Sequence, residues 1–401
     1  MTDGGGDDPD EDGEADARTS EDRPALVDDL LAGDHRALAR AITRIENRAP
    51  GYRGLVSALY AHAGTASVVG VTGSPGAGKS TLVGELARGY RDRGETVGII
   101  AVDPSSPFTG GAVLGDRIRM GPTVGDMDVF VRSMSARGRL GGLSTATDDA
   151  ITALDAFGKD RILIETVGAG QNEVDVVRTA DTVVVLVQPG SGDDVQMLKA
   201  GILEIGDVFV LNKADVDGAD RTAADLREML ERRDDGPRDA PGRGHHGSGE
   251  TGAGSRGPDA VGADRGADRT TGTVAGDADD GADESWSPPV VETVATRGEG
   301  IDDLLAALDA HRDWLSRTGR LRERTLARHA ESIRRLLRED AGRLLEEELA
   351  RLGGVEALAE AVQARETDPY AVADEVLAPV ADCVRERRDA GSATDGDRSG
   401  G

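Results

Sequence analysis

The octapeptide GSPGAGKS at positions 73–80 constrains the fold of this chain more than any other segment. It fits the pattern G-x-x-x-x-G-K-[ST], and it lies between an apolar run, SVVGVT, and a helix-like stretch, STLVGELARGY. Glycines in such a turn let successive backbone N–H groups converge on phosphate oxygens, and the helix that follows adds its positive end. We therefore predict a strand, a loop that binds a nucleoside triphosphate, and a helix. A glycine-rich turn that binds nothing is the alternative.

Two side chains at the end of the octapeptide have specific predicted roles. Lys79 is expected to reach the β- and γ-phosphates, and the Ser80 hydroxyl is expected to bind Mg2+. The pattern does not identify the base. The predicted nucleotide contacts of this segment are Gly73, Ser74, Pro75, Gly76, Ala77, Gly78, Lys79, Ser80 and Thr81.

Seven apolar runs alternate with helical patterns in the middle of the chain. The runs are nearly continuous rather than alternating, which is typical of strands that are covered on both faces in a parallel sheet. We predict an α/β fold, a P-loop NTPase domain with a mostly parallel, doubly wound sheet, flanked by helical extensions at both ends. The runs are 67–72, 96–102, 128–132, 161–166, 182–187, 207–212 and 290–295.

Composition divides the 401 residues into segments. The region 234–289 consists mainly of Gly, Asp, Arg and Ala, and such a composition cannot bury enough apolar surface to fold. The sheet can resume after it, because the entropy of loop closure grows only with the logarithm of loop length. We expect an acidic disordered tail at 1–22, a helical extension at 23–62, a P-loop domain at 63–315 with a disordered insert at 234–289, a helical extension at 316–386, and a disordered tail at 387–401.

Charge and composition indicate which partners and which surroundings to expect for this protein. The formal net charge is −28, so a nucleic acid partner is not expected, because phosphate backbones require basic surfaces. The chain has only four lysines, and an acidic, lysine-poor surface is typical of a protein that stays soluble in concentrated salt; we expect a halophile. No apolar run is long enough to span a membrane, and the acidic N-terminus is unlike a secretory signal. We therefore expect a cytoplasmic protein.

The tetrapeptide NKAD at the end of the run 207–212 predicts the base. The Asp215 carboxylate can accept hydrogen bonds from guanine N1–H and the exocyclic amine together, and adenine offers no such pair of donors. A site built on hydrogen bonds rejects an analogue that lacks them by about four orders of magnitude. Asn212 is expected to orient the loop, and the Lys213 stem to cover the base. A backbone contact to the guanine oxygen is expected from the turn at Ala295, Thr296 and Arg297.

Acidic residues near the predicted phosphate end of the sheet suggest a metal site. Glu165 ends the run RILIET, and Gly168 follows it at the position where NTPases sense magnesium and the γ-phosphate. Asp103 ends another run, and Asp116 lies in the segment after it. Asp103 and Asp116 could each hold Mg2+, orient the attacking water or cap a loop, and Glu165 could instead cap the next helix.

With GSPGAGKST, AVDPSSPFTGGAVLGDRIRM, IETVGAGQNE, VLNKAD and ATRGEGIDDL taken together, the chain resembles the MeaB/ArgK family of P-loop GTPases. The resemblance runs from about residue 25 to 350 apart from the insert, and the stretch 103–120 is its most specific part. It implies a GTP-binding and GTP-hydrolysing chaperone that gates the loading or protection of adenosylcobalamin in methylmalonyl-CoA mutase or a related mutase. It also implies a homodimer.

The same resemblance implies roles for individual residues. Lys79, Asp103, Asp116 and Glu165 would form the catalytic set, with Ser80, Asp103, Asp116 and Glu165 around magnesium and the hydrolytic water. Gln171, Asn172 and Glu173 would belong to a switch that couples to the mutase.

Two other functions are open from the sequence. A nickel metallochaperone GTPase of the hydrogenase- or urease-maturation type needs clusters of His or Cys, and the chain has six scattered histidines and one cysteine. An ATP-dependent kinase of a transport protein is the other alternative, and NKAD argues against it because that motif selects guanine.

Overall fold

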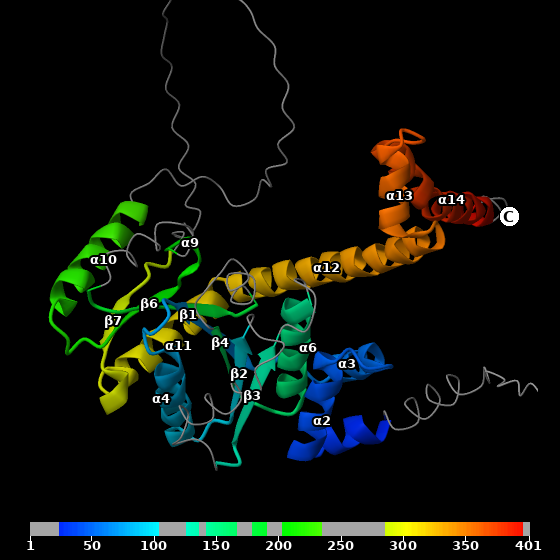
Figure 1. The fold of residues 1–401 in the computed structure, drawn as a ribbon. Coiled ribbons are helices and arrows are strands. Elements are labelled where there is room, and N and C mark those ends of the chain that lie inside the picture. The colour runs from blue at the N-terminus through cyan, green and yellow to red at the C-terminus, as the bar shows by residue number, and fades with distance from the viewer. Residues whose placement is uncertain are drawn as a thin grey trace, which may run out of the picture.

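The computed structural model describes residues 24–103, 126–135, 142–166, 179–190, 203–234 and 285–395. Within these residues the core is a seven-stranded sheet in the order β3-β2-β4-β1-β5-β6-β7 (Figure 1). All neighbouring strands are parallel, which confirms the predicted sheet. The strands are β1 Ser67–Gly73, β2 Val97–Asp103, β3 Val129–Ser135, β4 Arg161–Thr166, β5 Thr182–Val187, β6 Val208–Asn212 and β7 Val290–Thr293.

Helices cover the sheet and extend beyond it at both ends of the described chain. They are the helical residues 24–31, α2 His35–Glu46, α3 Tyr52–Tyr60, α4 Lys79–Asp92, α6 Gly142–Ala156, α9 Leu203–Ile205, α10 Ala219–Asp234, η2 Ala295–Arg297, α11 Ile301–Arg317, α12 Arg320–Arg351, α13 Gly354–Gln363 and α14 Pro369–Asp395.

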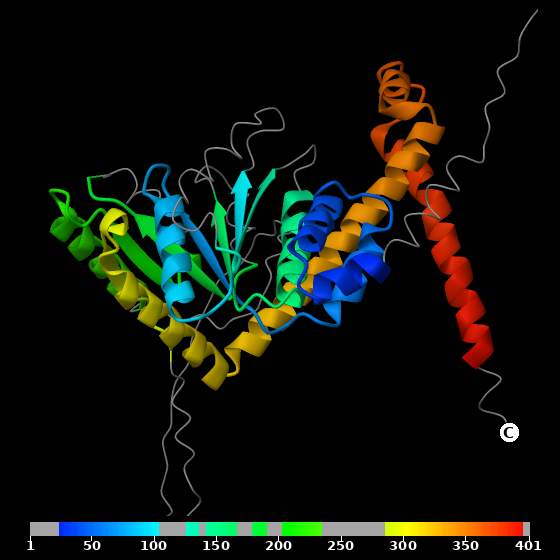
Figure 2. The same cartoon turned by 90° about the horizontal axis from the view of Figure 1, so that it is seen from below.

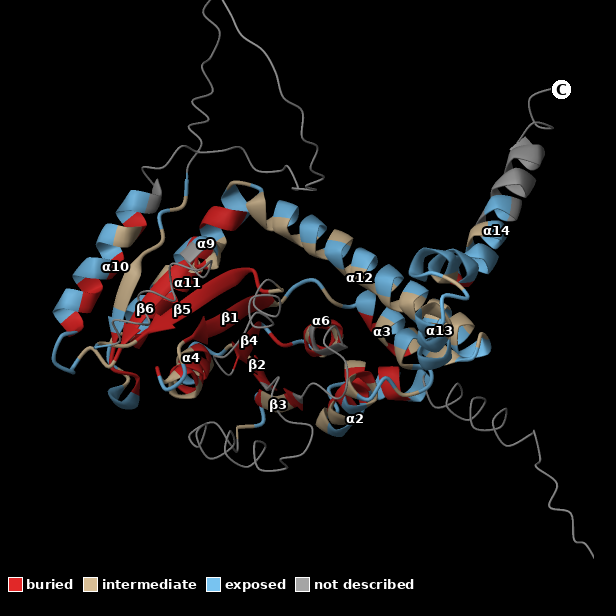
Figure 3. Cartoon of the chain, turned by 45° about the horizontal axis from the view of Figure 1, so that its top comes forward, coloured by how far each residue is buried: buried red, intermediate tan, exposed pale blue. Residues whose placement is uncertain are grey.

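Alternate residues of the central strands face different cores. Val184 of β5 lies in one core with Leu86 of α4 and Leu304 of α11, whereas the next residue, Val185, lies in another with Leu226 of α10. A third core joins the sheet to α2, α3 and α6. Figure 3 shows the central strands of the sheet buried, whereas the edge strands β3 and β7 are only partly buried. The strands are apolar on both sides because helices cover both faces, so the doubly wound arrangement is confirmed.

Strand boundaries follow the apolar runs closely. The runs 161–166 and 182–187 coincide with β4 and β5. The last strand, β7, ends at Thr293 instead of residue 295, because the chain turns there into the 3-10 helix η2. This turn is held by an antiparallel bridge between Val294 and Glu299.

The last residues of the predicted disordered insert are held in place by a tryptophan, which the composition of the insert did not predict. Residues 235–284 lie outside the described part of the chain, whereas residues 285–289 are described. Trp286 Nε1 donates to the backbone oxygen of Asp207 at 2.8 Å, and its ring centroid lies 4.7 Å from that of His311. The chain therefore enters β7 from a fixed point beside β6. A single tryptophan among serine and proline has no periodicity that sequence reasoning could use.

Figure 2 shows the long helix α12 running past the sheet and extending beyond it, and charged side chains connect this helix to the rest of the domain. Arg324 donates to Asp207 through two nitrogens, at 2.8 and 3.0 Å. Farther along the helix, Asp340 accepts two hydrogen bonds of 2.8 Å from Arg53 of α3. No residue of α12 is buried. Ion pairs therefore take the place of an apolar interface between this helix and the domain.

Beyond the sheet, α13 and α14 pack on the distal part of α12 and on each other. Figures 1 and 3 show these helices standing away from the sheet and largely exposed. Among the described helices, none is both long and apolar enough to cross a bilayer.

His311 of α11 is a fully buried titratable group beneath the sheet. Its Nδ1 lies 2.9 Å from Thr182 Oγ1, and its Nε2 lies 3.4 Å from Asp207 Oδ1. Burial lowers the pKa of His311 from 6.5 to about 4, against the raising effect of Asp207. The folded protein therefore binds fewer protons at this site than the unfolded chain does.

We expect a corresponding dependence of stability on pH. Because the folded-state pKa is depressed, the contribution of His311 is complete above pH 6.5 and is lost as the pH falls toward 4. Over that window it amounts to about 3 kcal/mol of unfolding free energy. Urea unfolding across this range at fixed salt should show a smaller acid-induced loss in His311→Gln than in the wild type. The exposed His62→Gln is the control. Parallel curves for the wild type and His311→Gln would contradict this assignment.

Candidate nucleotide-binding site

The octapeptide forms a tight turn between β1 and α4, as predicted. Two of its glycines are required by close approach. A Cβ at Gly73, where φ is +137°, would lie 2.1 Å from the backbone oxygen of Leu186 in β5. A Cβ at Gly78, where φ is +99°, would lie 2.5 Å from Asn212 Nδ2. The loop therefore depends on glycine for contact with the neighbouring strands as well as for access to phosphate.

Lys79 begins α4 and turns back over the loop. Its Nζ donates to the backbone oxygens of Gly73, at 2.6 Å, and Ser74, at 3.0 Å. The side chain is buried. The ammonium group is thus held at the mouth of the turn, where the helix N-terminus also lies.

Ser80 and Glu165 meet at the neighbouring strand end. Ser80 Oγ donates to Glu165 Oε1 at 2.5 Å, so the hydroxyl and the carboxylate predicted to bind magnesium are in contact. Both are hard oxygen ligands of the kind that Mg2+ prefers. No three His, Cys, Asp or Glu side chains gather as a metal site in the described ranges. This donor set fits Mg2+ held by one or two protein ligands together with nucleotide phosphates.

The other predicted acidic and switch residues are only partly placed. Asp103 is the last residue of β2, beside β4, where Val102 pairs with Thr166. Its backbone therefore lies at the same edge of the sheet as Glu165. Asp116, Gly168 and the residues Gln171 to Glu173 lie outside the described part of the chain.

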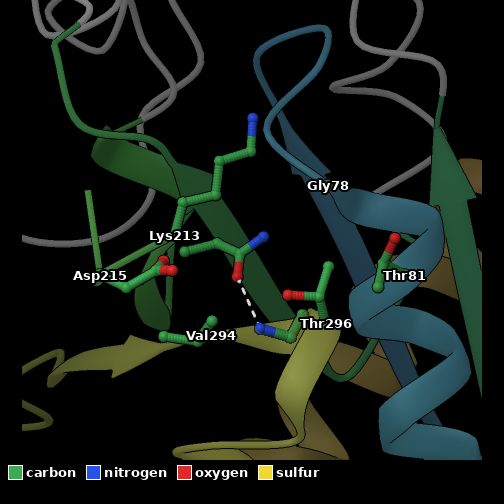
Figure 4. Close-up of a pocket in the computed structure, with 8 residues that line it drawn as sticks. Gly78, Thr81, Lys213, Asp215, Val294 and Thr296 are labelled. Carbon is green, nitrogen blue, oxygen red and sulfur yellow. Dashed lines mark hydrogen bonds between the residues drawn. The ribbon is translucent and has the colours of Figure 1, made fainter.

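Asn212 connects three segments at the end of β6. Its Nδ2 donates to the backbone oxygen of Ala77 in the phosphate loop at 2.7 Å. Its Oδ1 accepts from Thr293 Oγ1 at 3.1 Å. The same oxygen accepts from the backbone N–H of Ala295 at 3.1 Å, the hydrogen bond dashed in Figure 4. The predicted orienting role of Asn212 thus has a concrete geometry. The turn at Ala295, Thr296 and Arg297 is predicted to contact the guanine oxygen through its backbone, and in this structure the Ala295 N–H of that turn is directed at Asn212.

The two charged residues of NKAD are also fixed. Lys213 has a positive φ of 61°, and its Nζ donates to the backbone oxygen of Gly76 at 2.8 Å and to Gln188 Oε1 at 2.9 Å. Asp215 Oδ2 accepts from Arg297 Nη1 at 2.9 Å. The Lys213 stem therefore spans the space between its own strand end and the phosphate loop.

These segments line a partly open cavity of about 90 Å³. It lies where the loops after β6 and β7 approach the start of α4 (Figure 4). Sequence reasoning named every lining residue except Val294, an apolar side chain at a strand end with no recognisable motif. The cavity is lined by Gly78, Thr81, Asn212, Lys213, Asp215, Val294, Ala295 and Thr296.

Comparison with known proteins places the chain in a family. The family model described as methylmalonyl Co-A mutase-associated GTPase MeaB matches residues 38–349. The chain belongs to the MeaB family. The resemblance read from its motifs is confirmed, and members of this family are GTPases that bind guanine nucleotides.

Three relatives of this MeaB family chain illustrate the breadth of the match. A Pyrococcus abyssi protein named "Putative GTPase" is 43% identical over 352 residues, which is 88% of this chain and 95% of that protein. A fused isobutyryl-CoA mutase of Cupriavidus metallidurans is 38% identical over 214 residues, 52% of this chain and 19% of that protein. The crystal structure of a LAO/AO transport system kinase matches with a TM-score of 0.58 and 22% identity, over 90% of this chain and 98% of that one. This last likeness confirms the fold.

The contact between Gly78 and Asn212 generates a test of the site. Gly78→Ala places a methyl group against the Asn212 amide and should displace it from Ala77 and Ala295. Leaving such buried groups without partners costs about 1–3 kcal/mol of unfolding free energy. We expect this loss in urea unfolding, together with weaker binding of GDP.

The matched control is Gly94→Ala. Gly94 also has a positive φ, +82°, but a Cβ there meets nothing within 4 Å. Both variants carry the backbone strain of a left-handed residue, so their difference in unfolding free energy isolates the Asn212 contact, whereas the loss of GDP affinity also includes any change in the phosphate loop itself. Equal stability and equal GDP affinity in the two variants would show that the contact is unimportant.

Proposed function

We propose that this protein is a Mg2+-dependent GTPase whose nucleotide state gates the loading or protection of adenosylcobalamin in an acyl-CoA mutase. The part of this proposal that concerns nucleotide binding rests on one observation. The NKAD segment, the turn after β7 and the phosphate loop converge on one cavity, and Asn212 bonds all three segments together.

Guanine selectivity would reside in Asp215. Its carboxylate lies in the wall of the cavity and can accept from both N1–H and the 2-amino group of guanine. Adenine presents no donor at either of these positions, because its N1 is an acceptor and its C2 carries no amino group. The stem of Lys213 crosses from β6 to Gly76 and would cover one face of the base.

Phosphate binding would exchange hydrogen bonds at Lys79. Its ammonium group would leave the carbonyls of Gly73 and Ser74 for phosphate oxygens, which form stronger, charge-assisted bonds. Ser80 and Glu165 would hold Mg2+, which neutralises β- and γ-phosphate oxygens when bound. Asp103 and Asp116 stay predicted members of this catalytic set, and Gly168 stays a predicted contact of the γ-phosphate.

Nucleotide binding gives the direct test of this half. We expect the wild type to bind GTP far more tightly than ATP, and Lys79→Ala to lose hydrolysis. Asp215→Asn should lower GTP affinity by about 10- to 100-fold, because each hydrogen bond to a charged group contributes about 1.5–3 kcal/mol. Isothermal titration with GTP and ATP measures the two effects on affinity, and release of phosphate from GTP measures the loss of hydrolysis in Lys79→Ala.

The control for Asp215→Asn is Asp217→Asn. It makes the same change of charge two residues farther along, at an exposed position that does not line the cavity. Equal affinity of the wild type for ATP and GTP would refute the assignment of the base, and retained GTP preference in Asp215→Asn would refute the role of its carboxylate.

The mutase half of the proposal rests on the family and on one relative. The family description names methylmalonyl Co-A mutase, and the Cupriavidus relative is a fused isobutyryl-CoA mutase that aligns with about half of this chain. We infer that this chain serves a separate mutase subunit. We also infer a homodimer, because α12 exposes an apolar row comprising Ile333, Leu337 and Leu344, which a second copy would cover.

Affinity capture tests the partner. The tagged protein, loaded with GDP or with a non-hydrolysable GTP analogue, should retain a cobalamin-dependent mutase from the source organism's extract, to an extent that depends on the nucleotide. The buffer should contain concentrated salt, because the net charge of −28 is typical of a halophile. Recovery of no mutase in either state would contradict the chaperone role, and a monomer mass in sedimentation would contradict the homodimer.

A further inference from the structure

Arg297 forms an ion pair with the carboxylate of Asp215, the group proposed to select guanine. It ends η2, and its Nη1 donates to Asp215 Oδ2 at 2.9 Å. The motif that selects guanine does not include this residue, because Arg297 comes from the turn after β7, 82 residues farther along the chain.

The other donors of Arg297 are occupied by Glu299. Arg297 Nε donates to Glu299 Oε1 at 2.7 Å, and Nη2 donates to Glu299 Oε2 at 3.1 Å. This two-point contact matches the planar fork of the guanidinium and fixes its orientation. Glu299, followed by Asp215, raises the pKa of Arg297, and Arg297 lowers the pKa of Glu299.

The backbone around Arg297 is also fixed. Val294 and Glu299 form an antiparallel bridge with N–O distances of 3.0 and 3.3 Å, and Arg297 N donates to the backbone oxygen of Val294 at 2.9 Å. Gly300, with φ of +76°, lies so close to Glu292 that a Cβ there would meet its backbone oxygen at 2.1 Å. The turn therefore presents the guanidinium from a defined position.

The geometry distinguishes a supporting role from a blocking one. An ionised carboxylate offers about four lone-pair sites on its two oxygens. Arg297 uses one nitrogen on one oxygen, because Nε and Nη2 face Glu299. Acceptor sites on both oxygens stay available to the two donors of guanine, so Arg297 and the base can be bound by Asp215 at once.

We propose that Arg297, held by Glu299, is a positioning residue that aims the Asp215 carboxylate at the N1–H and 2-amino group of guanine. This inference rests on the proposed binding of guanine nucleotides and goes beyond it, because it adds a second determinant of base selectivity from outside NKAD. Fixing the carboxylate before binding reduces the rotamer freedom that the base would otherwise have to restrict.

Inosine diphosphate provides the discriminating probe, because hypoxanthine keeps N1–H but lacks the 2-amino group. A carboxylate held in the correct orientation gains binding free energy from both the N1–H and the 2-amino group. A freely rotating carboxylate gains less from the 2-amino group. Arg297→Ala should therefore lower the ratio of GDP to IDP affinity by about two- to fivefold, the effect expected of an exposed ion pair. Glu299→Gln should shift the ratio in the same direction by less, since the guanidinium keeps one strong partner.

The matched control is Arg227→Ala. Arg227 pairs with Glu292 at 2.8 Å, with side-chain exposures of 51% and 39%, against 49% and 39% for Arg297 and Asp215. Neither Arg227 nor Glu292 lines the cavity. This variant removes the same charge and the same kind of ion pair from the same domain, and it should leave the GDP-to-IDP ratio at the wild-type value.

The possible results separate the hypotheses. An unchanged ratio in Arg297→Ala would overturn the positioning role, and tighter GDP binding in that variant would show that Arg297 blocks the site. A reduction of equal size in Arg227→Ala would assign the effect to net charge and would also overturn the proposal. Failure of the wild type to bind GDP would instead refute the proposed nucleotide function.

Discussion

The buried amide of Asn212 is the interaction on which the arrangement of the site depends. Its donor side holds the phosphate loop, and its acceptor side holds the end of β7 and the turn that follows. The phosphate loop, the end of β6 and the turn after β7 are far apart in sequence, since Ala77 and Ala295 lie 135 and 83 residues from Asn212. A side chain that offers both donors and acceptors suits this junction, because neither an apolar residue nor a carboxylate could satisfy all of these partners.

Much of the fold could be predicted because it depends on local pattern. The runs that became β4 and β5 have consecutive apolar residues at their centres, and every position of both strands is buried, as expected in a sheet that is covered on both faces. The phosphate loop and NKAD could be predicted for a related reason. Each is a short segment whose residues act together, and each follows a strand in a parallel sheet, so their convergence at one edge is a consequence of topology.

The parts that escaped prediction depend on pairs of distant residues. The contact of Arg324 with Asp207 spans 117 residues, and an arginine-rich sequence offers many equivalent partners for every acid. The same is true of Arg297 and Asp215. Trp286 belongs to no periodic segment or motif, and Val294 was predicted only as part of the run 290–295, since nothing in that run marks it as a residue of the cavity wall. Three-dimensional proximity alone distinguishes these residues from their neighbours in the sequence.

The way in which Lys79 is held has a consequence for the protein without nucleotide. Its buried ammonium group donates to two carbonyl oxygens of its own loop, so this charge has hydrogen-bond partners inside the protein without any phosphate group. A phosphate group that binds Lys79 as proposed would have to compete with these carbonyl oxygens, and only the difference between the two sets of hydrogen bonds would contribute to affinity. Under the proposed function, the same ammonium group would have two alternative sets of acceptors, the carbonyl oxygens of its own loop and the phosphate oxygens of the nucleotide.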